Sequence, residues 1–548
     1  MPIIFVFLHG YINANLTMTI QEKNIPKALI ILLTFSIIIR GFLAGFHELG
    51  NDEVYYWTYA LYPDWSHFDH PGMVGWMTQL FSLNLLFDSE FALRLSSVIL
   101  MTVDTWLIYL IGTQLKNKIT GFFAALLYTA SLYAFVITGV FIMPDTPLMF
   151  FTLISIYLFI KHFKTKHNSL VETRKFASLQ RNVALLLAGL FAGLAMLSKY
   201  SAAFIWLGVG LFVLFYDRKE LKNGYLYLSV LISALCLLPI LIWNMQNDFI
   251  SFTFHGDRVS LFGKPRWDYF GAELAGELIY NNPVVYILII ITLIAFFRKQ
   301  FSTETCGTRL LLLIALPWIG TFLYFSLTRS TLPHWSAPGV CLLIPIAGAY
   351  LAAQQENMTG IYRIPTVIIA ALLLLIIAVG VGTFEIKTGC IQSLFVSEEP
   401  MDMTKVGDGD ATLDLYGWDQ MREGFASVRD SLVATGEMQA DEGIIALNWF
   451  PAANIDYYIA RPLGMQLYAI GDMDNIHKYH WINEKRGGPQ KGGNYWFINR
   501  THNYSDPCWR LKPNFEKVIP VDTFAVYRSG RVVEYVFVYK LKNYKCAN

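Results

Sequence analysis

The chain has 548 residues, of which 55% are hydrophobic and 15% charged, and its mean hydropathy is +0.42. This composition is far more apolar than that of an ordinary soluble protein. The formal net charge is +1, so no field of the whole chain favours a nucleic acid as partner. These properties predict a polytopic α-helical membrane protein.

Apolar runs that are long enough to cross a bilayer recur through residues 1–384. Each transmembrane helix needs roughly 20 predominantly apolar residues. By this criterion we predict about eleven transmembrane helices, near residues 27–46, 91–112, 119–140, 146–161, 183–198, 201–216, 225–243, 284–297, 309–327, 337–353 and 364–384. Residues 1–384 are therefore predicted to form a membrane domain.

The distribution of Lys and Arg predicts the orientation of the chain. Alternate loops, among them the loop at 161–182, carry most of the basic residues between the spans, whereas 47–90 has no Lys or Arg. Because cytoplasmic loops are enriched in Lys and Arg, we predict a cytoplasmic amino terminus and an outer location for 47–90. An odd number of spans then places the carboxy terminus outside. The segment MPIIFVFLHGYI has no basic region and no clear cleavage site, so we predict no signal peptide there.

The sequence changes in character after about residue 385. The segments GDGDATLDLYGWDQMREGF, EGIIALNWFPAANIDYYIARPLGMQLYAI, GGNYWFINR and RVVEYVFVYKLKN are typical of short strands between Gly, Asn, Asp and Pro turns. An amphipathic helix is predicted near 417–435. We therefore predict a small extracytoplasmic α/β domain in 385–548. A bridge between Cys508 and Cys546 is one alternative for its cysteines, which would leave Cys390 over.

The predicted outer loop 47–90 contains a cluster of acids and aromatic residues. Its segment NDEVYYWTYALYPDWSHFDHP has four carboxylates, two histidines and seven aromatic residues. If the segment begins as a helix, one face combines a carboxylate with three rings, which are Asp52, Tyr55, Tyr56 and Tyr59. Rings that stack on a sugar, beside a carboxylate that binds or deprotonates a hydroxyl, suit a sugar-binding site. The alternative is an interfacial aromatic belt with Asp52 as a helix cap.

The other predicted outer loops add one acid and several cations. Asp145 lies in FIMPDTPL, Lys199 in LSKYSAA, Arg258 in the long loop after IWNMQNDF, and both Arg329 and His334 in TRSTLPHWSAPG. Acids in the early loops and cations in the later ones suit a phosphate group held by the cations, opposite a carboxylate that activates a nucleophile. The alternatives are an N-cap role for Asp145 and, for each cation, a position at the membrane interface with its charge in water.

The first loop also contains the segment H-x-D-H, formed by His67, Asp69 and His70. These residue types can ligate a metal ion, but the sequence shows no fourth ligand. We favour a role in docking the loop and predict no metal site, and a divalent metal remains the alternative. No cofactor is otherwise indicated.

Several motifs resemble one family of membrane enzymes. DEVYYW followed by SHFDHPGMVGW is similar to the first-loop signature of the GT-C membrane glycosyltransferases related to dolichyl-phosphate-mannose-protein mannosyltransferases (glycosyltransferase family 39-like) and bacterial aminoarabinose transferases. FIMPDTPLMFF, GLAMLSKYSA, LPILIWNMQNDFISF and LPHW resemble later blocks of the bacterial type, in the same order. DLYGWDQM and NWFPAANIDYYIARP resemble its extracytoplasmic part. The resemblance implies a GT-C-like fold and an inverting transfer from a polyprenyl-phosphate sugar, without a nucleotide sugar.

The resemblance also implies roles for individual residues. Asp52 would deprotonate the acceptor hydroxyl, Glu53 would orient the loop or bind sugar, and Asp145 would be a second binding or relay carboxylate. The predicted substrate-binding residues are Tyr55, Tyr56, Tyr59, His70, Lys199, Arg258, Arg329 and His334. The acceptor would be a lipid, glycan or protein, and the active site would face outward from a bacterial inner membrane.

Two other functions fit a polytopic membrane protein. A transporter needs ionisable residues near the middle of the bilayer, and the predicted spans contain only Arg40 and Asp104 of this kind. No paired broken helices and no symmetry between halves of the chain are visible in the sequence. An envelope binding protein that recognises a partner through residues 385–548 is the second alternative. The polar residues at the outer ends of the spans favour the transferase.

Overall fold

The computed structural model describes residues 18–165, 174–257, 263–358, 360–394 and 402–545. The chain forms two compact units, Met1–Leu43 with Arg94–Ile377 and Ala44–Leu93 with Ala378–Asn548. The loop 47–90, which we expected within the domain 1–384, therefore packs with residues of the predicted domain 385–548.

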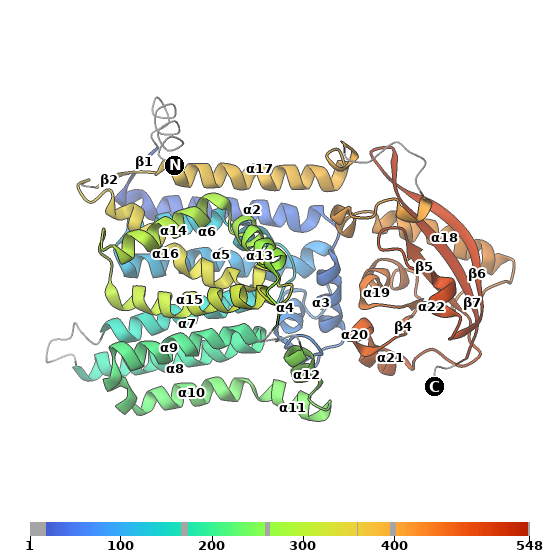
Figure 1. Ribbon diagram of the computed structural model, residues 1–548, viewed down its shortest axis with the longest axis horizontal. Helices are drawn as coiled ribbons and strands as arrows, with labels where there is room; N and C mark the ends of the chain where they lie inside the picture. Colours follow the sequence, from blue (N-terminus) through green and yellow to red (C-terminus); the bar gives the residue numbers. More distant parts are fainter. Residues whose placement is uncertain (1–17, 166–173, 258–262, 359, 395–401, 546–548) are drawn as a thin grey trace. The chain divides into compact units, whose positions relative to one another are not determined.

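The first unit is a bundle of helices (Figure 1). Helix α7 packs on α8, α8 on α10, α6 on α16, and α15 on both α9 and α16. A short antiparallel pair joins β1 (Thr19–Gln21) to β2 (Ile361–Arg363). The helices are α2 (Ile25–Phe46), α5 (Glu90–Leu115), α6 (Lys118–Ala130), α7 (Asp145–Thr165), α8 (Arg174–Ser198), α9 (Ala203–Tyr216), α10 (Gly224–Cys236), α11 (Leu238–Gln246), α12 (Ile250–Asp257), α13 (Trp267–Tyr280), α14 (Pro283–Phe297), α15 (Thr305–Ser326), α16 (Ala337–Ala353) and α17 (Thr366–Thr388).

The predicted membrane-spanning character is confirmed. Seven helices in the described part of the chain are long and apolar enough to cross a membrane, and there are eight if α13 and α14, which meet at 103°, form one span. Three shorter apolar helices lie at Lys118–Ala130, Tyr200–Tyr216 and Ala337–Ala353. Each of the eleven predicted segments contains helix, and eleven as the number of spans stays a prediction.

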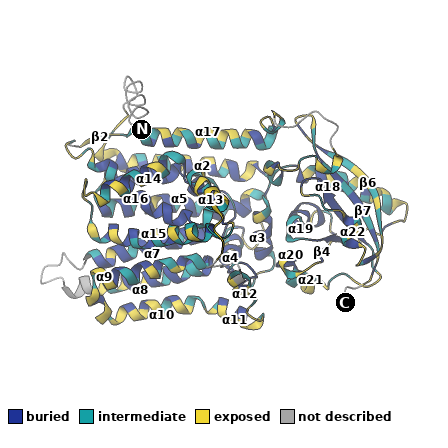
Figure 2. Cartoon of the chain, viewed as in Figure 1, coloured by how far each residue is buried: buried dark blue, intermediate teal, exposed yellow. Residues whose placement is uncertain are grey.

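Burial within the bundle separates central helices from peripheral ones (Figure 2). Every residue of α6 from Ile119 to Ala130 is buried. A Cβ on Gly348 of α16 would lie 2.7 Å from the carbonyl oxygen of Thr120, so a small residue lets the two backbones approach. In contrast, only 28% of the apolar window of α2 and 17% of that of α17 are buried. Apolar helices that are exposed in this way are typical of contact with lipid.

The second unit is built on a five-stranded sheet of order β4-β3-β5-β7-β6. Strand β3 pairs in parallel with β4 and β5, and β7 is antiparallel to β5 and β6. The strands are β3 (Ile444–Ala446), β4 (Leu467–Ala469), β5 (Tyr495–Arg500), β6 (Phe515–Arg528) and β7 (Arg531–Tyr544). The helices are α3 (Asn51–Leu61), α4 (Met73–Phe81), α18 (Trp418–Ala434), α19 (Trp449–Ile455), α20 (Met473–Ile476), α21 (Tyr479–Arg486) and α22 (Pro507–Leu511).

The predicted α/β fold of residues 385–548 is confirmed, but several of its elements differ from the prediction. Residues Trp449–Ile455, in a segment predicted as strands, form helix α19. Helix α18 matches the helix predicted near 417–435, and β3, β4, β5 and β7 lie in segments predicted as strands. The segment 411–415 is a 3-10 helix instead of a strand. We missed β6, an edge strand that contains Pro520 and whose exposed residues obscure its alternation. Cys508 is a free thiol, and Cys546 lies outside the described residues.

Glu48 connects the segment before α3 to the start of α18. Its carboxylate accepts hydrogen bonds from the backbone N–H groups of Trp418 at 3.1 Å and Asp419 at 3.5 Å. Burial raises the pKa of Glu48 from 4.5 to about 7, and these hydrogen bonds offset only part of that effect. Glu48 therefore titrates near neutral pH.

We expect the stability of the second unit to fall as the pH rises through about 7. A carboxyl group whose pKa is raised by folding stabilises the fold fully below its unfolded pKa and loses that contribution as pH rises through the folded value. Glu48→Gln keeps the acceptor and removes the charge. Thermal unfolding at pH 5 and pH 8 should show a smaller decrease for this variant than for the wild type. Equal decreases would contradict the assignment.

Candidate functional site

Asp52 and Glu53 lie in the first turn of α3 and have opposite environments. The N–H of Gly50, the N-cap, donates to Glu53 Oε2 at 2.9 Å. Glu53 is 2% exposed, whereas Asp52 is exposed. Because neighbouring helical residues point about 100° apart, the turn that buries Glu53 presents Asp52 to solvent. Glu53 caps the helix, and Asp52 is the member of the pair that a substrate can reach.

Two tyrosines of α3 hold Asp69 in the loop before α4. The hydroxyl groups of Tyr55 and Tyr59 donate to the same oxygen, Asp69 Oδ1, at 2.8 and 2.5 Å. The three tyrosines predicted to stack on sugar are at most 5% exposed and pack on one another at centroid distances between 5.4 and 5.7 Å. The contacts of these tyrosines with Asp69 and with one another hold the loop against α3. That Tyr55, Tyr56 and Tyr59 bind a sugar stays a prediction.

Asp69 is ionised although it is buried. Burial by itself raises the pKa of a carboxyl group. The charges of His70 and His477 oppose it, as do the hydrogen bonds from the two tyrosines, and the pKa of Asp69 lies below its ordinary value. His70, which we predicted to bind substrate, thus helps to lower the pKa of Asp69, a carboxylate of its own loop.

The H-x-D-H segment forms a tight loop. The N–H of His67 donates to the carbonyl oxygen of His70 at 3.1 Å, and Ser66 forms a β-bridge with Pro71. The His67 ring lies 3.7 Å from the ring of Tyr59. Within the described residues, no three His, Cys, Asp or Glu side chains are arranged to hold a metal ion. These contacts are those of a loop docked on α3.

A lysine from far along the chain reaches the carboxyl end of α3. Lys478 Nζ donates to the carbonyl oxygens of Thr58 at 2.9 Å and Tyr62 at 2.7 Å, and it lies 4.4 Å from the centre of the Tyr59 ring. Helix ends leave such carbonyl groups unpaired and favour a cation. Burial and the charge of Lys485 lower the pKa of Lys478 well below its ordinary value. The loop 47–90 has no Lys or Arg of its own, but Lys478 supplies hydrogen-bond donors at the end of α3 opposite Asp52.

We expect Lys478→Met to destabilise the second unit by about 1–3 kcal/mol, because the carbonyl group of Tyr62 loses its donor and the buried one of Thr58 loses one of its two donors. The variant keeps most of the apolar stem, so lost packing contributes little. Thermal unfolding of the purified protein measures the effect. Lys485→Met is the matched control, since Lys485 is exposed on the same helix segment. A Lys478→Met protein as stable as this control would show that the hydrogen bonds contribute nothing.

In the first unit, Asp145 and Lys199 form a buried ion pair. Lys199 Nζ lies 2.8 Å from Asp145 Oδ2, and Tyr133 donates its hydroxyl proton to Oδ1 at 3.0 Å. Asp145, the first residue of α7, is 1% exposed, and Lys199, which precedes the 3-10 turn η4 (Tyr200–Ala202), is 8% exposed. Buried charges are stable when they are paired and hydrogen-bonded. The structure thus joins two residues that the sequence suggested separately.

The predicted residues Arg329 and His334 follow α15, with His334 in the 3-10 turn η6 (Pro333–Trp335). Burial, and then the charge of Lys199, lower the pKa of His334 to about 4, while Asp145 opposes them. His334 is therefore neutral at pH 7. Arg329 is half-buried, and its Nε has no hydrogen-bond partner among the described residues. Arg258 lies outside the described residues.

A π-helical turn, η2 (Tyr133–Ile137), directs Tyr133 toward Asp145. The guanidinium of Arg40 donates to the carbonyl oxygens of Ala134 at 3.4 Å and Phe135 at 3.3 Å, and it lies 4.6 Å from the Phe135 ring centre. Such turns recur at functional sites because they redirect side chains. Arg40, one of the two charges predicted inside a span, therefore supports the backbone behind the Asp145–Lys199 pair.

Comparisons with known proteins agree with the motifs. The family model described as dolichyl-phosphate-mannose-protein mannosyltransferase matches residues 69–243. The lipid A galacturonosyltransferase RgtD of Rhizobium johnstonii is 26% identical over 202 residues, which is 36% of this chain and 38% of RgtD. The similarity in sequence thus spans well under half of that relative.

The solved structures extend the likeness to nearly the whole chain. ArnT from Cupriavidus metallidurans in the apo state superposes with a TM-score of 0.56 at 12% identity, covering 94% of this chain and 98% of ArnT. The same ArnT bound to undecaprenyl phosphate gives a TM-score of 0.57 at 14% identity, with the same coverage. The chain has the fold of the GT-C membrane glycosyltransferases. The predicted resemblance and fold class are confirmed, and the GT-C fold includes the carboxy-terminal domain.

Two residues of these clusters were missed from the sequence. Tyr133 lies in an apolar span, where a single tyrosine is unremarkable, and only the π-helical turn brings it to Asp145. Lys478 follows the polar segment GDMDNIH and precedes Tyr479, and its burial was the signal that the sequence could not provide. Tyr133 contacts a residue 12 positions along the chain, whereas Lys478 contacts Thr58, which is 420 positions away.

Proposed function

We propose that the protein is an inverting glycosyltransferase that moves a sugar from a polyprenyl phosphate to an acceptor hydroxyl group at the outer face of the membrane. The observation that carries the proposal is the first turn of α3, which uses Glu53 as a cap and exposes Asp52 in a chain with the GT-C fold. ArnT, which shares this fold over 98% of its length, has been solved with undecaprenyl phosphate bound. A lipid phosphate carrier is therefore the donor class that the likeness supports.

In the proposed reaction Asp52 accepts the proton of the acceptor hydroxyl group. The hydroxyl oxygen forms a bond to the anomeric carbon, and the bond from that carbon to the phosphate oxygen breaks. The sugar passes through an oxocarbenium-like state, and attack from the face opposite the phosphate inverts the anomeric centre. The phosphate leaves on its lipid with the bonding electrons.

We propose that the basic residues of the first unit bind the phosphate group of the donor. Lys199 already neutralises Asp145, so its charge is shared. Arg329 has a buried Nε without a partner in the described chain, and neutral His334 offers a further hydrogen bond. Charge-assisted hydrogen bonds of this kind are the strong ones in phosphate recognition. Arg258 remains a proposed fourth ligand, and Asp145 with Tyr133 would position Lys199.

We further propose that the protein lies in a bacterial inner membrane with the second unit on the extracytoplasmic side. The absence of Lys and Arg from 47–90, compared with the basic loop 161–182, supports this orientation. Labelling of single cysteines introduced at Trp65 and Trp509, both exposed, tests it in intact cells. Both positions should react with a membrane-impermeant reagent, and protection of either one would contradict the orientation.

The function itself is tested with purified protein, a panel of labelled polyprenyl-phosphate sugars and an envelope extract. Mass spectrometry should identify a product that has gained one sugar, from one donor of the panel. Nucleotide sugars serve as the control donors and should give no product. Sugar transfer from a nucleotide sugar, with none from any polyprenyl phosphate, would refute the proposed donor class.

A further inference from the structure

A cavity lies in the second unit where the parallel strands β3 and β5 end. Its empty space is about 500 Å³, including the mouth that opens to solvent. It is lined by residues that follow β3, from Ala446 to Pro451, and by residues at and after the end of β5, from Phe497 to Ser505. The cavity is thus formed by the carboxyl ends of two adjacent parallel strands.

The topology of the sheet makes this place a natural ligand site. After β3 the chain continues through α19 to β4 on one side, whereas after β5 it continues to β6 and β7 on the other side. In sheets of this kind, ligands bind at the carboxyl ends of strands whose connections leave in opposite directions, because the diverging segments open a crevice. The cavity occupies that crevice.

The lining combines an apolar wall with polar groups and has no carboxylate. Phe450 and Phe497 contribute rings, and Asn448 contributes an amide whose side chain does not cap α19. Arg500 and His502 line the cavity, and no Asp or Glu does. Rings beside amide and cationic donors suit a sugar that carries a negative charge.

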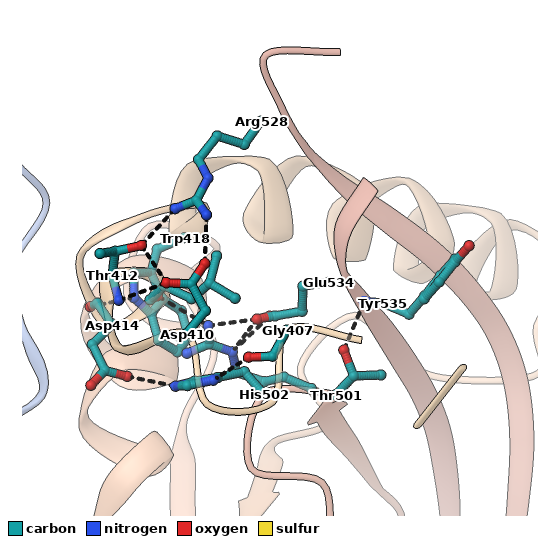
Figure 3. A network of polar contacts seen from close by, with 12 residues as sticks. Gly407, Asp410, Thr412, Asp414, Trp418, Thr501, His502, Arg528, Glu534 and Tyr535 are labelled. Atoms are coloured by element: carbon teal, nitrogen blue, oxygen red, sulfur yellow. Dashed lines mark hydrogen bonds and ion pairs between the residues drawn. The ribbon is translucent and has the colours of Figure 1, made fainter. Parts of the chain in front are cut away.

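Hydrogen bonds to carboxylates and a carbonyl group hold the two cationic residues, and Figure 3 shows those of His502. Arg500 donates from Nε and Nη2 to the carboxylate of Glu534 at 2.8 and 2.7 Å, and its guanidinium lies 4.2 Å from the Trp418 ring centre. Arg500 is 2% exposed, and its Nη1 has no hydrogen-bond partner among the described residues. A buried N–H group without a partner is costly, so a ligand acceptor at Nη1 would be favourable.

His502 is fixed as a donor at both ring nitrogens. Nδ1 lies 2.9 Å from the carbonyl oxygen of Gly407, and Nε2 lies 3.0 Å from Asp414 Oδ1. Both partners accept hydrogen bonds, so the protonated ring fits this position. Burial opposes protonation, but the bond to Asp414 and the carbonyl group outweigh it and raise the pKa of His502. Arg500 and His502 line the cavity, and their carboxylate partners Glu534 and Asp414 do not.

We propose that this cavity binds a monosaccharide unit that carries a carboxylate or phosphate group. The sugar ring would lie on the apolar wall beside Phe450, and its anionic group would meet Arg500 Nη1. Asn448 and Ser505 would bind hydroxyl groups. This binding site is separate from Asp52 in the sequence and does not depend on the proposed transfer reaction.

Calorimetric titration of the purified full chain tests the proposal, with D-glucuronate, D-glucose and inorganic phosphate as the probes. D-glucuronate should bind more tightly than D-glucose and than phosphate, because only it has both the ring and the charge. Asn448→Leu, which replaces the amide by an apolar side chain of similar length, should weaken D-glucuronate binding at least tenfold. Asn475→Leu is the matched control, since Asn475 is exposed and does not line the cavity.

Ser505→Val, which removes the other proposed hydroxyl-binding group, replaces Asn448→Leu if that variant does not fold, and thermal unfolding identifies that case. Unchanged D-glucuronate affinity in the folded variants, or no D-glucuronate binding by the wild type, would overturn the proposal. Phosphate binding as tight as that of D-glucuronate would also overturn it, because the site would then recognise an anion without a sugar.

Discussion

Asp52→Asn is expected to lower the rate of sugar transfer about 10²-fold or more, the effect of removing a general base. Asparagine keeps the size and the capping ability of the side chain but cannot accept the proton. Asp52 is exposed on α3, so folding and donor binding should be unchanged. Initial rates with a fixed polyprenyl-phosphate sugar, and binding of the same donor, measure the two quantities.

Glu53→Gln is the matched control for this variant. Its amide oxygen can still accept the hydrogen bond from the N–H of Gly50, which Glu53 accepts now at 2.9 Å. The rate should therefore change far less than in Asp52→Asn. If Asp52→Asn retains a nearly wild-type rate while Asp145→Asn or Asp69→Asn is inactive, the base is a different carboxylate.

Lys199→Met is expected to cost about 3–5 kcal/mol of stability, because it leaves the buried carboxylate of Asp145 without its partner. The double variant Lys199→Met with Asp145→Asn removes both charges and keeps an acceptor for Tyr133. It should recover most of the lost stability, since replacing a whole buried pair by neutral groups is often nearly neutral. Thermal unfolding of the single and double variants gives the coupling between the two residues.

The rate of sugar transfer by the double variant shows whether the ion pair of Asp145 with Lys199 only stabilises the fold or also takes part in the reaction. The double variant should remain inactive in sugar transfer even where its stability is restored, because the proposed phosphate ligand is gone. Lys219→Met, at an exposed position, controls for the loss of a lysine. A stable double variant with wild-type affinity for the donor would show that Lys199 serves only to neutralise Asp145.

Local sequence patterns were sufficient to predict those helices whose formation depends on the residues of a single segment. Apolar runs located the spans, and the spacing of Asp52, Tyr55 and Tyr59 indicated a helix that the structure contains as α3. Hydropathy also placed helix α18 correctly, because its apolar residues repeat at helical spacing. In these cases burial follows from the sequence of the element itself.

Contacts between distant segments were not predictable in the same way. Lys478 and Thr58 are 420 residues apart, and no local pattern shows which carbonyl groups a lysine will meet. The tyrosines of α3 illustrate the same limit, because their spacing suggested an open sugar-stacking surface and the fold buries them around Asp69. Tyr133, which donates a hydrogen bond to Asp145, lies in a π-helical turn, whose position a period of 3.6 residues does not indicate.

The most direct measurement of the proposed function follows both halves of the donor at once. Purified protein is incubated with an undecaprenyl-phosphate sugar labelled separately in the sugar and in the phosphorus, together with the acceptor extract. The proposed mechanism predicts that the sugar label moves to the acceptor with inverted anomeric configuration while the phosphorus label stays in the lipid as undecaprenyl phosphate. Transfer of both labels together, or retention of the anomeric configuration, would contradict it.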